Sequence, residues 1–138
     1  TEIKKTAADP VVDVMLEQKA LLEGKKYGGT MRLGSYPAYL KKGTIARSAY
    51  KKELVEERHR HRYEINPAYV KRIEDAGLIF SGTSPDGVLM EIAELPRGAH
   101  PFMLGTQFHP ELQARPLSPH PLFTEFMRAV IARKRKRR

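Results

Sequence analysis

His109, Pro110 and Glu111 stand at the end of an apolar run, 102–108, that predicts a buried strand. A histidine at the C-terminal end of such a strand points into the crevice where open α/β sheets bind ligands. The Glu111 carboxylate can turn back and accept the second N–H of the imidazole, an arrangement that orients a general base. The spacing alone favours a plainer alternative, in which the histidine caps the strand beside a solvated glutamate.

A second candidate site is the segment 57–64, which reads Glu-Arg-His-Arg-His-Arg-Tyr-Glu. If the segment is extended, its three arginines face one way, and its two histidines and its tyrosine face the other. A guanidinium there could hold an amino-acid carboxylate through two hydrogen bonds. A salt-bridged surface strand explains the same pattern equally well.

The histidines also raise the alternative of a metal site. Its ligands would be His59, His61, His109 and Glu111. The histidines lack the spacing of metal ligands on a helix, and the neighbouring arginines would repel a divalent cation. We therefore predict no metal site.

Strand and helix signals alternate along the chain, which predicts an α/β fold. Asn66 and Pro67 suit a helix N-terminus, and Gly77 suits the left-handed position after its end. Ser84-Pro85-Asp86-Gly87 is a turn by composition, so the flanking apolar segments form a hairpin. We predict strands at 11–16, 28–34, 78–80, 88–95 and 102–108, a loop or short helix at 17–27, and helices at 44–57, 67–76 and 122–132.

Length and composition describe one polar globular domain. Six of the nine net positive charges lie in the terminal run 133–138, for which we predict a solvated tail, with an anionic or nucleic-acid partner as the lesser alternative. No apolar run approaches the roughly 18–20 residues of a membrane span, and the N-terminus lacks a signal-peptide pattern. The 138 residues contain no cysteine, so they hold no disulfide, no thiolate metal site and no cysteine nucleophile.

Three segments together resemble the CTP synthase family. They are Gly-Gly-Thr-Met-Arg-Leu-Gly at 28–34, the arginine–histidine segment at 57–64, and Gln-Phe-His-Pro-Glu at 107–111. A His-Pro-Glu alone would indicate only a class I glutamine amidotransferase. The resemblance implies the C-terminal part of a flavodoxin-like class I glutamine amidotransferase domain with a mixed central sheet, over residues 1–132, followed by the basic tail.

The resemblance also implies a chemistry. A cysteine attacks the side-chain amide of glutamine, while His109 acts first as base and then as acid toward the departing ammonia. Glu111 orients His109. Arg62 falls on the position that binds the glutamine carboxylate, and Glu2 is a candidate ligand for the glutamine amino group.

Further expectations concern the whole protein of which this chain would be part. Thr30 and Arg32 match a lid that is associated with activation by GTP. Ammonia would pass to an N-terminal synthase domain that phosphorylates UTP with Mg-ATP and aminates it to CTP, with no cofactor in this chain. The family suggests a cytoplasmic homotetramer without a membrane partner.

The sequence departs from the family pattern at the nucleophile. The family cysteine lies on a Gly-x-Cys-x-Gly turn upstream of the position that matches Thr1. We expect the chain to be one piece of a cut, truncated or partly observed domain, and to be inactive alone. The alternative is a non-catalytic binding or regulatory module that senses glutamine through Arg62 and Glu2.

Overall fold

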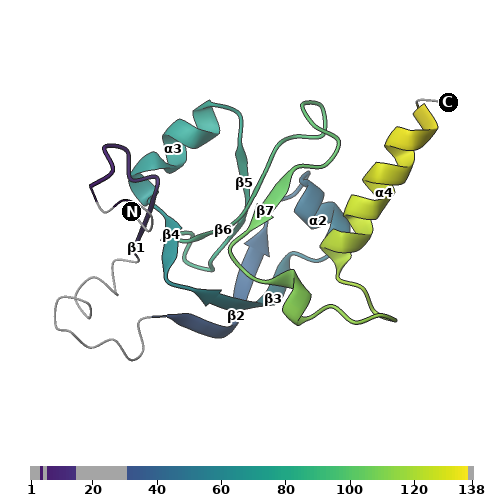
Figure 1. Ribbon diagram of the computed structural model, residues 1–138, viewed down its shortest axis with the longest axis horizontal. Helices are drawn as coiled ribbons and strands as arrows, with labels where there is room; N and C mark the ends of the chain where they lie inside the picture. Colours follow the sequence, from purple (N-terminus) through teal and green to yellow (C-terminus); the bar gives the residue numbers. More distant parts are fainter. Residues whose placement is uncertain (1–3, 5, 15–30, 137–138) are drawn as a thin grey trace.

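The computed structural model describes residues 4, 6–14 and 31–136 (Figure 1). Helices and strands interleave along this part of the chain, as expected for an α/β protein. The strands are β1 Val12–Val14, β2 Arg32–Leu40, β3 Leu54–His61, β4 Tyr63–Ile65, β5 Ile79–Thr83, β6 Met90–Glu94 and β7 Leu104–Thr106. The helices are α2 Ile45–Tyr50, α3 Pro67–Asp75 and α4 Pro121–Lys136, with a short 3₁₀ turn, η1, at Pro110–Leu112.

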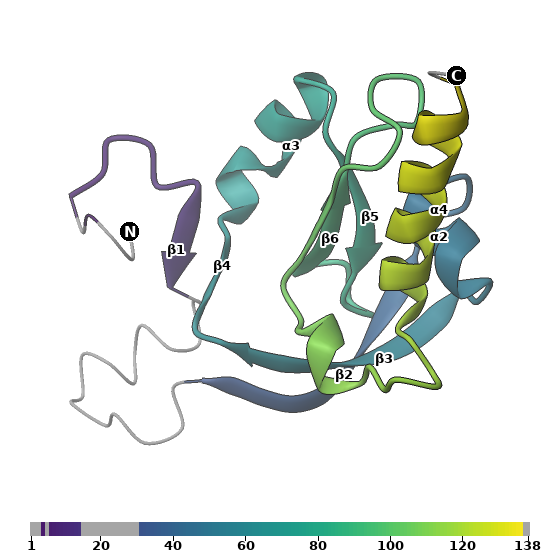
Figure 2. The same ribbon diagram turned by 45° about the vertical axis from the view of Figure 1, so that its right-hand side comes forward.

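The main sheet has the strand order β3-β2-β5-β6-β7, and each neighbouring pair is antiparallel. A second sheet consists of the antiparallel pair β1 and β4. In Figure 2, β2 and β3 cross the base of the molecule as a long ribbon, whereas β5 and β6 rise from it, so the sheet is strongly curled. The part of the sheet that the structure describes thus has antiparallel pairs only, where a mixed sheet was expected.

The structure confirms the helix predicted after Asn66 and the hairpin predicted around residues 84–87. The Asn66 side chain accepts a hydrogen bond from the N–H of Ala68 at the start of α3. Gly77 follows the end of α3 with a φ of 98°, which an L side chain rarely adopts. β5 and β6 pair around the turn 84–87, in which the Gly87 N–H donates to the Ser84 carbonyl at 2.8 Å.

The predicted helix at 44–57 is wrong in its second half. α2 ends at Tyr50 because Lys51 adopts a left-handed conformation, with a φ of 57°. From Leu54 the chain is a strand in which every second residue is buried, including Val55. The spacing of the apolar residues in this segment fits both the period of a helix and that of a strand. The pairing with β2 decides in favour of the strand.

The buried carboxylate of Glu94 holds the start of α2. Its two oxygens accept the N–H groups of Ile45 and Ala46 at 2.6 and 3.0 Å. These amides have no partner within the helix, so a carboxylate from β6 both satisfies them and complements the helix dipole.

β2 extends beyond its predicted end at Gly34 and continues to Leu40. Gly34 has a φ of 110°, so the glycine permits an unusual backbone inside the strand rather than ending it. The predicted segment 17–27 and the first residues of 28–34 lie outside the described residues.

The core lies between the sheet and the two helices α2 and α4, which are side by side in both views (Figures 1 and 2). Its buried cluster consists of Ala38, Leu40, Ala46, Val55, Ile92, Phe108 and Leu122. Of the apolar face predicted for α4, Leu122 is buried, whereas Phe126 and Val130 are 48% and 45% exposed. α4 continues through Lys136, past the predicted boundary at 132. Among the described residues, no helix has the length and apolar character needed to cross a bilayer.

We expect Gly82→Ala to destabilise the sheet by about 1–3 kcal/mol, because it overpacks the core. A Cβ at Gly82 would lie 2.7 Å from Cγ1 of Ile92 on the paired strand. Gly98→Ala is the matched control, since no atom lies within 4 Å of its added Cβ. Urea unfolding of both variants measures the difference; equal stabilities would contradict the packing described for β5 and β6.

Candidate active site

His109 is placed by β7 and by the core residue Phe108, which follows the end of this strand. Phe108 is buried in the core, and the His109 N–H donates to the carbonyl of Arg58 on β3 at 2.9 Å. Pro110 begins η1, which turns the chain back so that Glu111 Oε1 lies 2.7 Å from His109 Nδ1. The side chain of His109 is 39% exposed and forms part of a cavity wall.

The ionisation of Glu111 suits an orienting role. Its pKa is lowered by a hydrogen bond from its own backbone N–H and by the hydrogen bond with His109. The carboxylate therefore stays charged and accepts the Nδ1–H, which fixes the imidazole tautomer with its lone pair on Nε2.

A cavity of about 700 Å³ lies next to His109. Its walls include Arg62, which sits at the bend between β3 and β4, as well as Gln107. The Nε atom of Arg62 is buried, and no residue in the described part of the chain accepts a hydrogen bond from it. The structure thus brings the predicted base and the predicted carboxylate-binding arginine to one cavity.

The predicted alternation of residues 58–63 holds only up to His61. Arg58 and Arg60 are exposed and His59 is buried, as a strand requires. The bend at Arg62 breaks the pattern, so that Arg60, His61, Arg62 and Tyr63 all line the cavity.

Arg32, predicted as a lid residue, is buried at the start of β2. Its Nη1 lies 2.5 Å from Oε1 of Glu91, and its guanidinium lies 4.3 Å above the ring of Tyr36. Burial raises the pKa of Glu91, and the hydrogen bond and charge of Arg32 oppose that rise. Glu91 was missed at the sequence level, although a glutamate between the apolar residues of a buried strand is itself a signal.

A second buried carboxylate, Glu57, joins four parts of the fold. Oε1 of Glu57 accepts the Tyr50 hydroxyl at 2.6 Å and lies 2.9 Å from His120 Nε2. Oε2 accepts the side-chain amide of Gln113 at 3.1 Å, and that amide also donates to the Glu56 carbonyl at 3.0 Å. Burial and the hydrogen bond to Glu57 raise the pKa of Tyr50, so its hydroxyl remains a donor. This cluster, which sequence reasoning also missed, ties η1 to β3.

Two other predicted site residues, Glu2 and Thr30, lie outside the described residues. The structure therefore gives no position for the proposed ligand of the amino group or for the first lid residue.

The comparisons with known proteins place this site in a family. The class I glutamine amidotransferase family, described as "Glutamine amidotransferase class-I", matches residues 8–129, so the chain belongs to that family. The particular relatives are CTP synthases: that of Nocardioides sp. is 56% identical over 139 residues, which are 100% of this chain and 24% of that protein. That of Rubrobacter xylanophilus is 55% identical over 131 residues, 95% of this chain and 23% of that protein.

A solved structure agrees with these relatives. The glutaminase domain of Trypanosoma brucei CTPS, with bound acivicin, matches with a TM-score of 0.82 and 34% identity over 95% of this chain and 49% of that one. The class I amidotransferase fold and the resemblance to CTP synthase are thereby confirmed. The chain spans about a quarter, 24%, of the length of its Nocardioides relative.

Proposed function

We propose that this chain is the part of a CTP synthase glutaminase that binds glutamine and supplies the general base. The observation that carries the proposal is the cavity shared by His109 and Arg62, together with the 2.7 Å contact between His109 and Glu111. Membership of the amidotransferase family supports the same chemistry.

In the proposed reaction, Nε2 of His109 removes the proton of a cysteine thiol as the sulfur attacks the side-chain carbonyl carbon of glutamine. The resulting imidazolium then donates that proton to the departing nitrogen, which leaves as ammonia, and a glutamyl thioester remains. Water hydrolyses the thioester with His109 again acting as base. Glu111 stabilises the imidazolium at each step. Since these 138 residues contain no cysteine, the nucleophile must come from residues outside this sequence.

The cavity offers the glutamine a charge partner in Arg62. Its buried Nε has no acceptor in the described part of the chain, and a substrate carboxylate would satisfy it. We propose that Glu2 binds the amino group of glutamine, as the family pattern suggests.

Arg62→Met should raise KM for glutamine by about 10- to 100-fold and change kcat much less, because a hydrogen bond to a charged group contributes about 1.5–3 kcal/mol. The exposed Arg58 is the control, and Arg58→Met should leave KM nearly unchanged. Steady-state glutamine hydrolysis by the full-length protein measures both. An unchanged KM in Arg62→Met would remove the carboxylate assignment.

The rest of the proposal concerns the whole protein. Ammonia would be used by a synthase domain that acts on UTP with Mg-ATP, in a homotetramer. GTP would activate through the lid that includes Thr30 and Arg32. Because Arg32 is paired with Glu91, we assign it the task of holding β2 against β6 rather than of contacting the nucleotide. No cofactor is assigned to this chain.

The function is tested by the release of ammonia from glutamine. We expect the full-length protein to release it and to form CTP from UTP and ATP, whereas the 138-residue chain alone should release none, for want of a cysteine. Hydrolysis by the isolated chain would overturn the assignment of the nucleophile. A full-length protein that binds glutamine but does not hydrolyse it would instead establish the non-catalytic binding module.

A further inference from the structure

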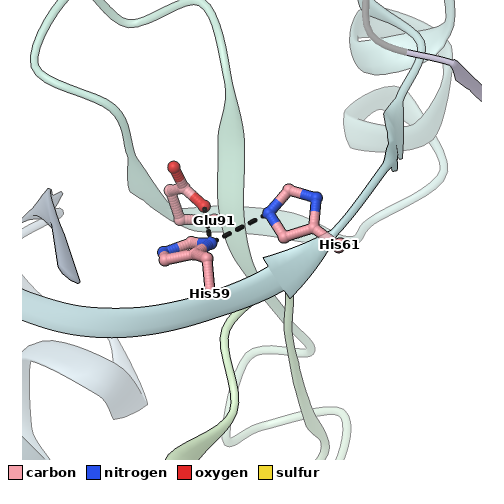
Figure 3. Close-up of side chains that lie close together, drawn as sticks. All are labelled: His59, His61 and Glu91. Atoms are coloured by element: carbon pink, nitrogen blue, oxygen red, sulfur yellow. Dashed lines mark hydrogen bonds and ion pairs between the residues drawn. The ribbon is translucent and has the colours of Figure 1, made fainter. Parts of the chain in front are cut away.

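Three potential metal ligands lie close together at the wall of the cavity. His59 and His61 lie two residues apart on β3, and Glu91 reaches them from β6 (Figure 3). His59 Nδ1 lies 2.9 Å from His61 Nε2 and 3.7 Å from Glu91 Oε2. One ligand atom of each residue falls within 4.8 Å of the other two.

The hydrogen bonds around these groups fix which ring nitrogen carries a hydrogen in the metal-free protein. His61 Nδ1 lies 3.0 Å from the Tyr63 carbonyl, which can only accept, so Nδ1 carries the hydrogen and Nε2 carries the lone pair. A backbone carbonyl that binds the second ring nitrogen is the usual outer contact of a metal-bound histidine. His59 Nδ1 therefore donates to His61 Nε2 at 2.9 Å, and a bound ion would take the place of that hydrogen, which would move to His59 Nε2. His59 Nε2 is buried without a hydrogen-bond partner in the described part of the chain. Glu91 Oε2 is buried without a hydrogen-bond partner in the described part of the chain.

We propose that His59, His61 and Glu91 bind a divalent transition-metal ion of the Zn²⁺ type. Two imidazoles and one carboxylate are a common zinc ligand set, and Mg²⁺ and Ca²⁺ prefer oxygen ligands. Tetrahedral zinc with bonds of about 2.0–2.1 Å separates its ligands by about 3.3 Å, and the two distances from His59 Nδ1 fall on either side of this value. His61 and Glu91 also line the cavity. An ion could therefore enter through the cavity, and a water molecule from it could be the fourth ligand.

The structure removes one of the two sequence arguments against a metal. Histidines two apart on a strand share a face, so helical spacing is not needed. The argument from positive charge remains, because only Arg58 lies away from the site, whereas Arg60 and Arg62 line the cavity together with His61 and Glu91. Arg32 remains as a competitor, because it pairs with Oε1 of Glu91 and its positive charge opposes a second cation.

Because Arg32 competes with a cation for Glu91, its removal should increase the affinity for zinc, and this increase can be tested. Zn²⁺ is titrated by calorimetry into the full-length protein after removal of metal by a chelator, and Co²⁺ is used in parallel because its visible spectrum reports ligand number. We expect one Zn²⁺ per chain and a tetrahedral Co²⁺ spectrum. His61→Gln and Glu91→Gln should each weaken binding at least about 100-fold, since even an outer contact is worth about 10- to 100-fold. Arg32→Met should tighten it at least about tenfold.

The controls separate this site from other imidazoles. His100→Gln changes an exposed histidine outside the cluster, and it should leave zinc binding unchanged. Far-UV circular dichroism checks that each variant is folded, and the Co²⁺ spectrum of the unmodified protein needs no variant at all. The proposal is overturned if the unmodified protein binds no stoichiometric zinc, if Glu91→Gln binds zinc equally well, or if Arg32→Met binds it more weakly. None of these outcomes depends on glutamine hydrolysis, so they leave the proposed function untouched.

Discussion

His109→Ala should lower kcat for glutamine hydrolysis by the full-length protein by about 10³- to 10⁴-fold, the upper range for loss of general acid–base catalysis. The imidazole lines the cavity, and its Nδ1 lies 2.7 Å from Oε1 of Glu111, which leaves Nε2 to exchange protons with a reactant. Without it, neither the thiol proton nor the departing nitrogen has a partner. The side chain of His109 is 39% exposed, so its removal should cost less packing than the loss of a fully buried side chain.

Supplying ammonia directly separates this loss from a loss of structure. CTP formation by His109→Ala with added ammonium should match that of the unmodified protein, because the amination step does not use His109. The exposed His100 serves as control, and His100→Ala should retain activity with both nitrogen sources. Near-normal hydrolysis by His109→Ala would show that another group is the base.

Glu57→Ala should lower the free energy of unfolding by about 3–5 kcal/mol, because it removes one partner from a buried ionic cluster. The carboxylate of Glu57 is 3% exposed and contacts Tyr50, His120 and Gln113 at 3.1 Å or less. Tyr50 and His120 would lose their charged acceptor in the interior, although their mutual contact at 3.2 Å would remain. Gln113 is exposed and would keep its hydrogen bond to the Glu56 carbonyl.

Glu56→Ala is the matched control for this substitution. Glu56 is the preceding residue of β3 but faces outward, and its hydrogen bond to Gln113 uses the backbone carbonyl, which the substitution keeps. A change within about 0.5 kcal/mol is expected. Urea unfolding of the purified protein compares the two variants. If both cost the same, the cluster around Glu57 contributes little.

Features that depend on adjacent residues could be predicted from the sequence. Asn66, Pro67 and Gly77 fix α3 through local hydrogen bonding and backbone conformation, and the structure places that helix as expected. The pair His109 and Glu111 is equally local, since Pro110 fixes the turn between them.

Features that depend on distant residues could not be predicted. Arg32 and Glu91 are 59 positions apart in the chain, and Glu57 and His120 are 63 apart. Nothing near a buried glutamate reveals which cation or imidazole the sheet will bring to it. The wrong helix at 44–57 has the same origin, because the pairing of β3 with β2 decided a segment whose own pattern was ambiguous.

A single strand, β3, carries both sides of the cavity. The backbone of His109 is bonded to Arg58, the side chain of Gln113 is bonded to Glu56, and Arg62 follows the last residue of β3. A movement of β3 would therefore displace His109 and Arg62 together, and the distance between the base and the guanidinium would change little. The same coupling makes the segment intolerant of length changes. One residue inserted between Arg58 and Arg62 would turn every following side chain to the opposite face and uncouple the two groups.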